Sequence, residues 1–330
     1  MTRASRPIIR KGVPAPAMAG RLGPSIDQRR GVDYRDLQAA DLVNRCANPA
    51  LPFGWTLNPY RGCEMGCHYC FARYTHEFLG FTDPLSFERT IYVKRTDSGT
   101  LLAGLRRARR SGMLVAMGTA TDPYQPAEVT YRIARAVLEA ARQVPGLRLG
   151  ITTKSALVAR DVDLLSEIAG RSEVTVNFSV TTLDATLARR LEPRAPRPDR
   201  RLDALRTLAA AGVVTRLFIM PILPMITDGA DNLRGVLAAA REAGAAGAES
   251  NVLFLKLGTR ETFFGFLRGE FPRLVGAYER LYAGSAYASR GYVERLEARV
   301  AALAGEVGLP WRRRADRPSG RRTQQLSLAW

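Results

Sequence analysis

The sequence predicts an α/β fold built around a parallel sheet. Short runs rich in β-branched and aromatic residues alternate with amphipathic stretches, and this alternation recurs six times along the chain. Glycines stand where helices would end, as Gly212 and Gly244 illustrate. Hydrophobic residues make up 46% of the 330, enough for a substantial buried core.

The expected elements follow one another in a regular order. The candidate strands are residues 55–59, 114–118, 147–152, 174–180, 214–222 and 251–257. Helical faces between them are formed by Val129, Ile133, Val137 and Ala140, by Leu202, Leu205 and Leu208, and by Leu233, Val236, Leu237 and Ala240. A short helical segment is expected over 33–53, before the first strand. We therefore expect a central α/β domain over 33–258, followed by a helical extension over 259–310 that is rich in aromatic residues.

The net charge of +18 is concentrated at the two ends of the chain. Residues 1–30 carry seven basic residues and one acidic residue, and residues 311–330 carry six basic residues and one acidic residue. Arginine-rich arms with proline and glycine are usually disordered, and they attract phosphate backbones through counterion release. A disordered basic arm over 1–32 and a basic tail over 311–330 are therefore expected, with nucleic acid as the natural partner. A tail that contacts nothing specific would have the same composition.

The cysteine count and the apolar runs predict a cytoplasmic protein. Three of the four cysteines lie in one loop, which leaves Cys46 without a partner and makes a disulfide framework unexpected. No run of 18 or more apolar residues indicates a membrane span. The N-terminal segment also lacks the apolar core of a secretory signal.

Cys63, Cys67 and Cys70 carry the strongest functional signal in the chain. Their spacing is C-x3-C-x2-C, and Gly62 and Gly66 directly precede the first two. Three thiolates in one loop can bind three irons of a [4Fe–4S] cluster and leave the fourth iron open. A backbone that wraps around a cluster needs positive φ at such glycines.

A structural zinc site is the alternative for the same cysteines. Cys46, His68 or His76 can supply a fourth ligand and complete a tetrahedron. Zinc motifs more often contain two separated C-x2-C pairs, and a chain of this length needs no metal in order to fold. The cluster is therefore the favoured interpretation.

The cysteine loop, with an aromatic residue before its last cysteine, resembles the signature of the radical S-adenosylmethionine (SAM) enzymes. The resemblance spans about residues 58–257. It implies a partial (β/α)6 TIM-like barrel with the cluster loop after the first strand, and an electron donor for the cluster. It also implies that the open iron binds SAM, which is split into methionine and a 5′-deoxyadenosyl radical.

The polar residues that follow the later strands are similar to those of the spore photoproduct lyase branch, whose members are often labelled putative DNA repair photolyases. In place of the common G-G-E motif, this chain has a Thr-Asp pair, and the resemblance implies that Thr121 and Asp122 contact the SAM ammonium. It also implies SAM contacts for Lys154, one of only four lysines, and for Ser179. An Asx turn at Asp122 and polar rim positions for the other residues are the alternatives. A Glu-Pro-Arg turn at 192–194 is shared as well.

This chain differs from the spore photoproduct lyase branch in the residue that would donate a hydrogen atom. The lyase returns a hydrogen atom from a cysteine just before its SAM-binding pair, and the matching residue here is Thr119, whose hydroxyl is a poor hydrogen-atom donor. Cys46 is the remaining candidate donor, and it would have to reach the site from the N-terminal segment. Repair of spore photoproduct by the same mechanism is therefore not expected.

The C-terminal peptide from Gln325 to Trp330 reads QLSLAW. It resembles the short tail that docks bacterial repair proteins on the replication sliding clamp, and its two leucines and tryptophan suit apolar pockets. This favours DNA as the partner. An RNA-modifying radical SAM enzyme and a zinc-stabilised, DNA-associated binding protein without catalysis are the alternative functions.

Overall fold

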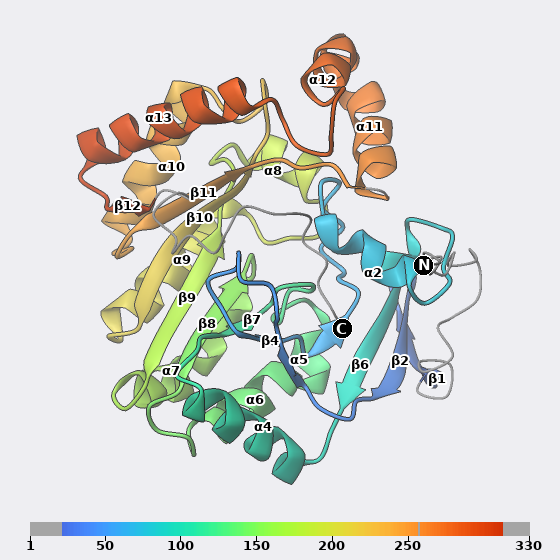
Figure 1. Cartoon of the computed structure of the whole chain (residues 1–330), viewed down its shortest axis with the longest axis vertical. Helices are drawn as coiled ribbons and strands as arrows, with labels where there is room; N and C mark the ends of the chain where they lie inside the picture. The colour runs from blue at the N-terminus through green and yellow to red at the C-terminus, as the bar shows by residue number, and fades with distance from the viewer. Residues whose placement is uncertain (1–21, 257, 313–330) are drawn as a thin grey trace, which may run out of the picture.

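Six parallel strands form the centre of the structure, a computed structural model that describes residues 22–256 and 258–312 (Figure 1). In sheet order these strands are β11 (Ala248–Val252), β10 (Val214–Ile222), β9 (Glu173–Ser179), β8 (Arg148–Thr153), β7 (Val115–Met117) and β4 (Trp55–Leu57). At one edge β3 (Val43–Arg45) pairs antiparallel with β4, and at the other β12 (Trp311–Arg312) pairs parallel with β11. The predicted α/β fold with a parallel, partial (β/α)6 barrel is thus confirmed.

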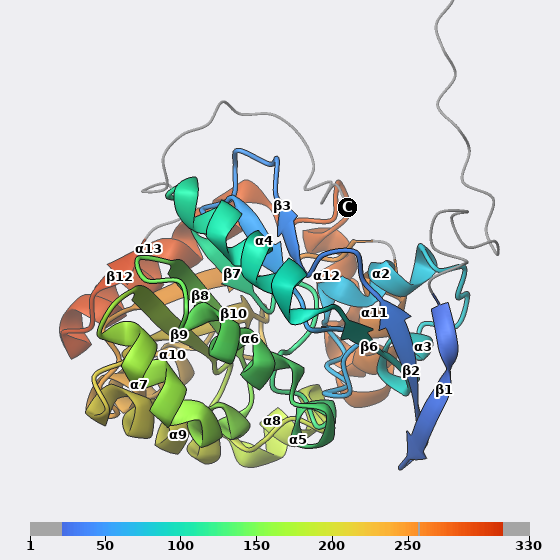
Figure 2. The same cartoon turned by 90° about the horizontal axis from the view of Figure 1, so that it is seen from below.

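Helices connect the parallel strands and lie on the outside of the curved sheet (Figure 2). They are α4 (Ser98–Arg110), α5 (Ala127–Tyr131), α6 (Ile133–Ala141), α7 (Val162–Ala169), α8 (Ala185–Leu191), α9 (Pro198–Ala210) and α10 (Ala230–Glu242). Their apolar faces pack on the strands through side chains such as Val137, Leu205 and Val236, which are fully buried. Val129 departs from the expected face and is 59% exposed. It belongs to α5, whereas the other residues of that face belong to a separate helix, α6.

Three further helices follow the last barrel strand. They are α11 (Thr259–Glu270), α12 (Val275–Leu281) and α13 (Arg290–Val307), and α13 leads into β12. Phe263 and Tyr278 are buried among them, so these aromatic residues serve packing. No helix in the described part of the chain combines the length and apolar character that crossing a bilayer requires.

A second, four-stranded sheet lies beside the barrel, and the sequence did not predict it. Its order is β1 (Leu22–Arg29), β2 (Val32–Gln38), β6 (Thr90–Arg95) and β5 (Tyr60–Arg61). The expectation of disorder up to residue 32 is wrong for 22–32, and the helical expectation for 33–53 is wrong as well. Buried Val32 and Tyr34 alternate with polar residues, which is a strand period, and β2 pairs with β6 far along the chain. Arg30 and Gly31, both at positive φ, form the hairpin turn.

Candidate cluster and SAM site

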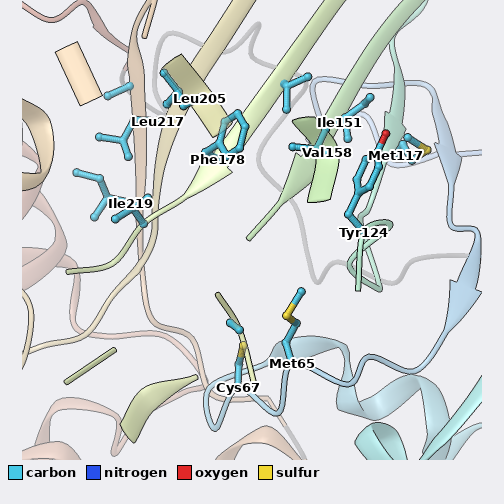
Figure 3. Packing of buried hydrophobic residues seen from close by; sticks show 14 of the residues in the cluster. Met65, Cys67, Met117, Tyr124, Ile151, Val158, Phe178, Leu205, Leu217 and Ile219 are labelled. Carbon is cyan, nitrogen blue, oxygen red and sulfur yellow. The ribbon is translucent and has the colours of Figure 1, made fainter. Parts of the chain in front are cut away.

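The cluster loop, defined here as residues 62–70, begins directly after β5 and ends at a 3-10 turn, η1 (Phe71–Arg73). Figure 3 shows Met65 and Cys67 pointing from this loop toward the strands that carry Ile151 and Phe178. The loop faces the C-terminal ends of the parallel strands, which is the side where barrel-type folds carry their chemistry.

One side of the cluster loop is held by residues that follow β7. The Thr121 hydroxyl donates to the Gly62 carbonyl at 2.6 Å, and the Gln125 side-chain amide donates to the same oxygen at 3.1 Å. Gln125 also accepts from the Glu64 backbone amide at 2.9 Å. Gly62 has a φ of +88°, and a Cβ there would lie 2.7 Å from the Thr90 carbonyl oxygen, so only glycine fits.

The other side of the loop is held by a buried arginine and by α11. The Arg73 guanidinium donates to the Cys67 carbonyl at 3.0 Å and pairs with Glu88 at 2.7 Å. Thr259 donates to the Cys70 carbonyl at 3.0 Å. Because these contacts use backbone atoms of the loop, they set its shape and leave the cysteine sulfurs available for a metal centre.

The donor set fits a [4Fe–4S] cluster. All three cysteines are free thiols; Cys63 and Cys67 are buried, and Cys70 is half-buried. Burial raises the pKa of the Cys63 thiol well above its usual value, and Asp122, Cys70 and Cys67 add to this effect. Burial also raises the pKa of Cys67, to about 12. Such thiols lose their protons when a metal centre binds, and each can ligate a different iron.

The zinc alternative lacks a fourth ligand among the described residues. Burial lowers the pKa of His76 to about 4, and its Nε2 lies 2.8 Å from the Thr90 carbonyl oxygen. The His68 ring stacks on Phe266 with the ring centroids 4.5 Å apart. Within 22–256 and 258–312, no three cysteine, histidine or acidic side chains come together closely enough to share one metal ion.

Asp122 lies at the junction of β7, β8 and the cluster loop. Its buried carboxylate accepts from the Tyr124 amide at 2.9 Å, which forms the Asx turn, and from the Thr153 hydroxyl at 2.7 Å. It also accepts from the Lys154 backbone amide at 2.7 Å. Burial raises the pKa of Asp122, although these donors oppose the shift. The carboxylate therefore joins two strand ends and remains an acceptor that one more cation can approach.

Lys154 and Ser179 lie at the ends of the next two strands. The Lys154 Nζ is 5.7 Å from the centre of the Tyr69 ring. Burial alone would lower the pKa of Lys154, but its electrostatic interactions with the acidic groups Cys67, Glu192 and Asp122 outweigh it and raise the pKa. Lys154 is thus a charged ammonium between the cluster loop and Asp122. Ser179 is buried and its carbonyl accepts from Arg201 at 2.9 Å.

A buried network of three side chains, which the sequence did not reveal, joins the cluster loop to α8 and α9. The Tyr69 hydroxyl donates to Glu192, and Glu192 forms an ion pair with Arg201 whose two side chains are each 2% exposed. Arg201 lies on the apolar face of α9 with Leu205, and a charge at such a position was the available signal. Arg194 of the same Glu-Pro-Arg turn is exposed.

The candidate hydrogen donor, Cys46, is not brought to the cluster loop. Cys46 follows β3, and its backbone amide donates to Gly54, just before β4 begins. This is the N-terminal end of the parallel strands, opposite the cluster loop. The Thr119 hydroxyl is engaged with the Asn58 side-chain amide at 3.0 Å.

A partial barrel with three free cysteines in one loop that faces the C-terminal ends of its parallel strands is the arrangement of an iron–sulfur enzyme of the barrel class. Residues 57–234 match the model of the Radical SAM superfamily, and the chain belongs to that superfamily. It is therefore a radical SAM enzyme, whose cofactors are a [4Fe–4S] cluster and SAM.

Related chains and structures agree with this membership. An uncharacterized protein of Mycobacterium tuberculosis is 36% identical over 280 residues, covering 84% of this chain and 82% of the relative. Spore photoproduct lyase complexed with dinucleoside spore photoproduct has a TM-score of 0.63 at 14% identity, covering 84% of this chain and 81% of the other. Streptococcus suis SuiB bound to SAM has a TM-score of 0.51 at 15% identity, covering 78% and 46%. At these identities the two structures show a shared fold.

Gly118, which directly follows β7, is expected not to tolerate a side chain. Its φ is +90°, and a Cβ would lie 2.5 Å from the Thr152 carbonyl oxygen and 2.8 Å from Cδ of Pro123. We expect Gly118→Ala to lower the free energy of unfolding by about 2–4 kcal/mol. Gly212→Ala is the matched control: its φ is +80° but its Cβ position is open, so the loss should be only about 1 kcal/mol. Equal losses in urea denaturation would contradict the steric argument.

Proposed function

We propose that Cys63, Cys67 and Cys70 ligate the [4Fe–4S] cluster, and that the enzyme acts on nucleic acid, with DNA favoured over RNA. The observation that carries the ligand assignment is the group of three neighbouring free thiols in a loop whose backbone is held by other side chains. These cysteines would hold the cluster, which with SAM and one electron from an external donor would supply radical chemistry that removes a hydrogen atom from the substrate.

The SAM contacts in this proposal are Thr121, Asp122, Lys154 and Ser179. Asp122 accepts from the ammonium of the methionine moiety, and the Lys154 ammonium pairs with its carboxylate as a point charge. Thr121 also donates to the Gly62 carbonyl, so it would hold the cluster loop in place beside the bound SAM. Ser179 borders the site from β9.

Nucleic acid is supported as the substrate by charge and by fold. The net charge is +18, and the matching lyase structure contains a dinucleoside lesion. An arginine-rich protein of this charge binds phosphate backbones in a salt-dependent way. The branch's cysteine-based hydrogen return is not part of the proposal, because Thr119 stands at that position and Cys46 lies at the far end of the barrel strands.

The test is anaerobic reconstitution with iron and sulfide, followed by reduction and EPR spectroscopy with and without SAM. The expected result is a [4Fe–4S]⁺ signal that changes when SAM is added, together with formation of 5′-deoxyadenosine. Stimulation of that product by DNA oligonucleotides, compared with RNA of the same sequence, tests the substrate. One tightly held zinc and no cluster signal would refute the ligand assignment. Stimulation by RNA alone would make the enzyme an RNA-modifying one.

Removal of residues 325–330 tests the proposed clamp partner. The peptide lies outside the described residues, so the proposal depends on its sequence, QLSLAW. We expect the truncated protein to lose detectable binding to the bacterial sliding clamp in surface plasmon resonance. Truncation at 325 leaves all of the tail's arginines in place, so the loss would not come from charge. Unchanged clamp affinity would end this part of the proposal.

A further inference from the structure

Arg61 and Lys94 lie on one face of the four-stranded sheet, beside the cluster loop. Arg61 is the last residue of β5 and comes two residues before Cys63. The register pairs Arg61 with Tyr92 on β6, and Lys94 follows two residues later, so the three side chains share a face. Side chains in such a diagonal arrangement are within reach of each other when they are long.

The Lys94 ammonium lies beside a second cation, Arg61, in a half-buried position. Both side chains are half-buried, and burial, with Arg61 adding to the effect, lowers the pKa of Lys94 to about 7. No ion pair or hydrogen bond joins the Lys94 ammonium to another residue of the described chain. Lys154 provides the contrast, because three negative groups surround it and its pKa is raised. A desolvated ammonium beside a second cation is a place where an anion binds favourably.

Lysine is rare in this protein. The chain has four lysines among 49 basic residues, and the three within the described ranges, Lys94, Lys154 and Lys256, are all half-buried. Surface charge is supplied by arginine instead. A lysine at a position where burial disfavours its charge contributes little to solubility, and its ammonium is suited to an anionic ligand.

Several aromatic rings lie near these two cations and near one another. The Arg61 charge acts on the Tyr74 hydroxyl, and Phe71 lies one helical turn before Tyr74. The Phe71 and Phe254 ring centroids are 5.4 Å apart, and those of Phe254 and Tyr287 are 5.8 Å apart. Tyr287 is 37% exposed. Cations followed by partly exposed rings are the pattern of single-stranded nucleic-acid binding, in which bases stack and phosphates pair.

We propose that Lys94 and Arg61 form a phosphate subsite for a single-stranded segment of nucleic acid at the cluster loop. This inference rests on the proposed nucleic-acid substrate and assigns a position to one of its phosphodiesters. The phosphate would pair with both cations, and the adjoining base would stack toward Phe254 and Tyr287. A strand held in this way passes the loop that carries Cys63.

The experiment is binding of a fluorescein-labelled single-stranded DNA oligonucleotide to the reconstituted full chain, measured by anisotropy at several salt concentrations. We expect Lys94→Gln to weaken binding about tenfold and to reduce the slope of log Kd against log salt by about 1. Arg106→Gln is the charge-matched control, since Arg106 is exposed on α4 outside the barrel, and should change Kd less than about twofold. Equal effects of the two variants would overturn the subsite.

Two further measurements separate the possible failures. SAM affinity of Lys94→Gln is measured in parallel, and a loss of SAM affinity with unchanged oligonucleotide affinity would assign Lys94 to the SAM carboxylate and overturn the proposal. Pyrophosphate is tested as a probe without bases. If wild-type protein binds pyrophosphate through Lys94 but no oligonucleotide, the phosphate subsite stands and the nucleic-acid function fails. If oligonucleotides bind and Lys94→Gln changes nothing, the function stands and the subsite fails.

The pH dependence of pyrophosphate binding provides a signature that a structural role would not produce. Because pyrophosphate itself gains negative charge over this range, the wild type is compared with Lys94→Arg at each pH. Since the pKa of Lys94 is lowered to about 7, the affinity of the wild type relative to that of Lys94→Arg should fall as the pH rises from about 6 to about 9. The other groups on this face do not change charge in that window. Burial raises the pKa values of Tyr92 and Tyr74 and lowers that of His76 to about 4, while Asp33 and Arg35 form an ion pair at 2.6 Å. A wild-type profile parallel to that of Lys94→Arg would refute the role of Lys94.

Discussion

Cys67→Ala is expected to abolish both cluster binding and SAM cleavage. Two remaining thiolates cannot hold a cluster that needs three ligands and an open iron, so iron and sulfide per chain should fall to background after reconstitution. No 5′-deoxyadenosine should form above the no-enzyme level. Cys63→Ala and Cys70→Ala should behave alike, since their sulfurs are neighbours of Cys67 in the cluster loop.

Cys46→Ala is the control for these variants. Cys46 is the fourth free cysteine and lies at the N-terminal end of the barrel strands, so its removal should leave iron content, the EPR signal and SAM cleavage as in the wild type. The folded state should persist in all four variants, because removing one sulfur costs about 1 kcal/mol. Full iron content in Cys67→Ala, or loss of the cluster in Cys46→Ala, would contradict the ligand assignment.

Glu192→Gln is expected to destabilise the protein by about 3–5 kcal/mol, because it leaves Arg201 buried without a carboxylate partner. It also weakens the hold on Tyr69, whose hydroxyl donates to Glu192 from within the cluster loop. We expect a lower midpoint of urea unfolding and a broader EPR signal from a less uniform cluster. Asp203→Asn is the matched control on α9: its ion pair with Arg206 is exposed, so the loss should stay below about 1 kcal/mol.

The pH dependence of stability gives the Glu192 prediction a second test. Burial alone would raise the pKa of Glu192, but Arg201 and Lys154 outweigh it and lower the pKa below its usual value. A lowered carboxyl pKa stabilises the fold above the unfolded-state pKa, and the stabilisation is lost as the pH falls through the folded-state pKa. Wild-type stability should therefore fall more steeply with acidification than that of Glu192→Gln. Parallel acid profiles would contradict the network's electrostatic role.

The barrel could be predicted because its information is local. Each parallel strand is a short apolar run, and each helix repeats its apolar residues on one face, as at Leu202, Leu205 and Leu208. Gly212 and Gly244, expected at helix ends, do follow α9 and α10, and both have positive φ. The four-stranded sheet could not be predicted in the same way, since β2 gains its partner, β6, more than fifty residues later in the chain. Local polarity and charge suggested an arm over 1–32 and a short helical segment over 33–53 instead.

The residues of the candidate site likewise differ in whether local sequence reveals them. The cysteines can be recognised in the sequence by their spacing, and Asp122 and Lys154 by their positions at the ends of predicted strands. Glu192 and Arg201 could not be recognised in this way, because their importance arises from a buried ion pair between two helices. Arg61 and Lys94 likewise become a pair only through the β5–β6 register.

The eight-stranded sheet ends in very short strands, and this has a consequence for handling the protein. A barrel that does not close has two edges, and unpaired edge backbone invites strand addition by a second molecule. Here the edges are β3 and β12, which are three and two residues long. Strands of this length offer few backbone groups to a neighbour, so the open architecture resists aggregation through its edges even before a metal centre is installed.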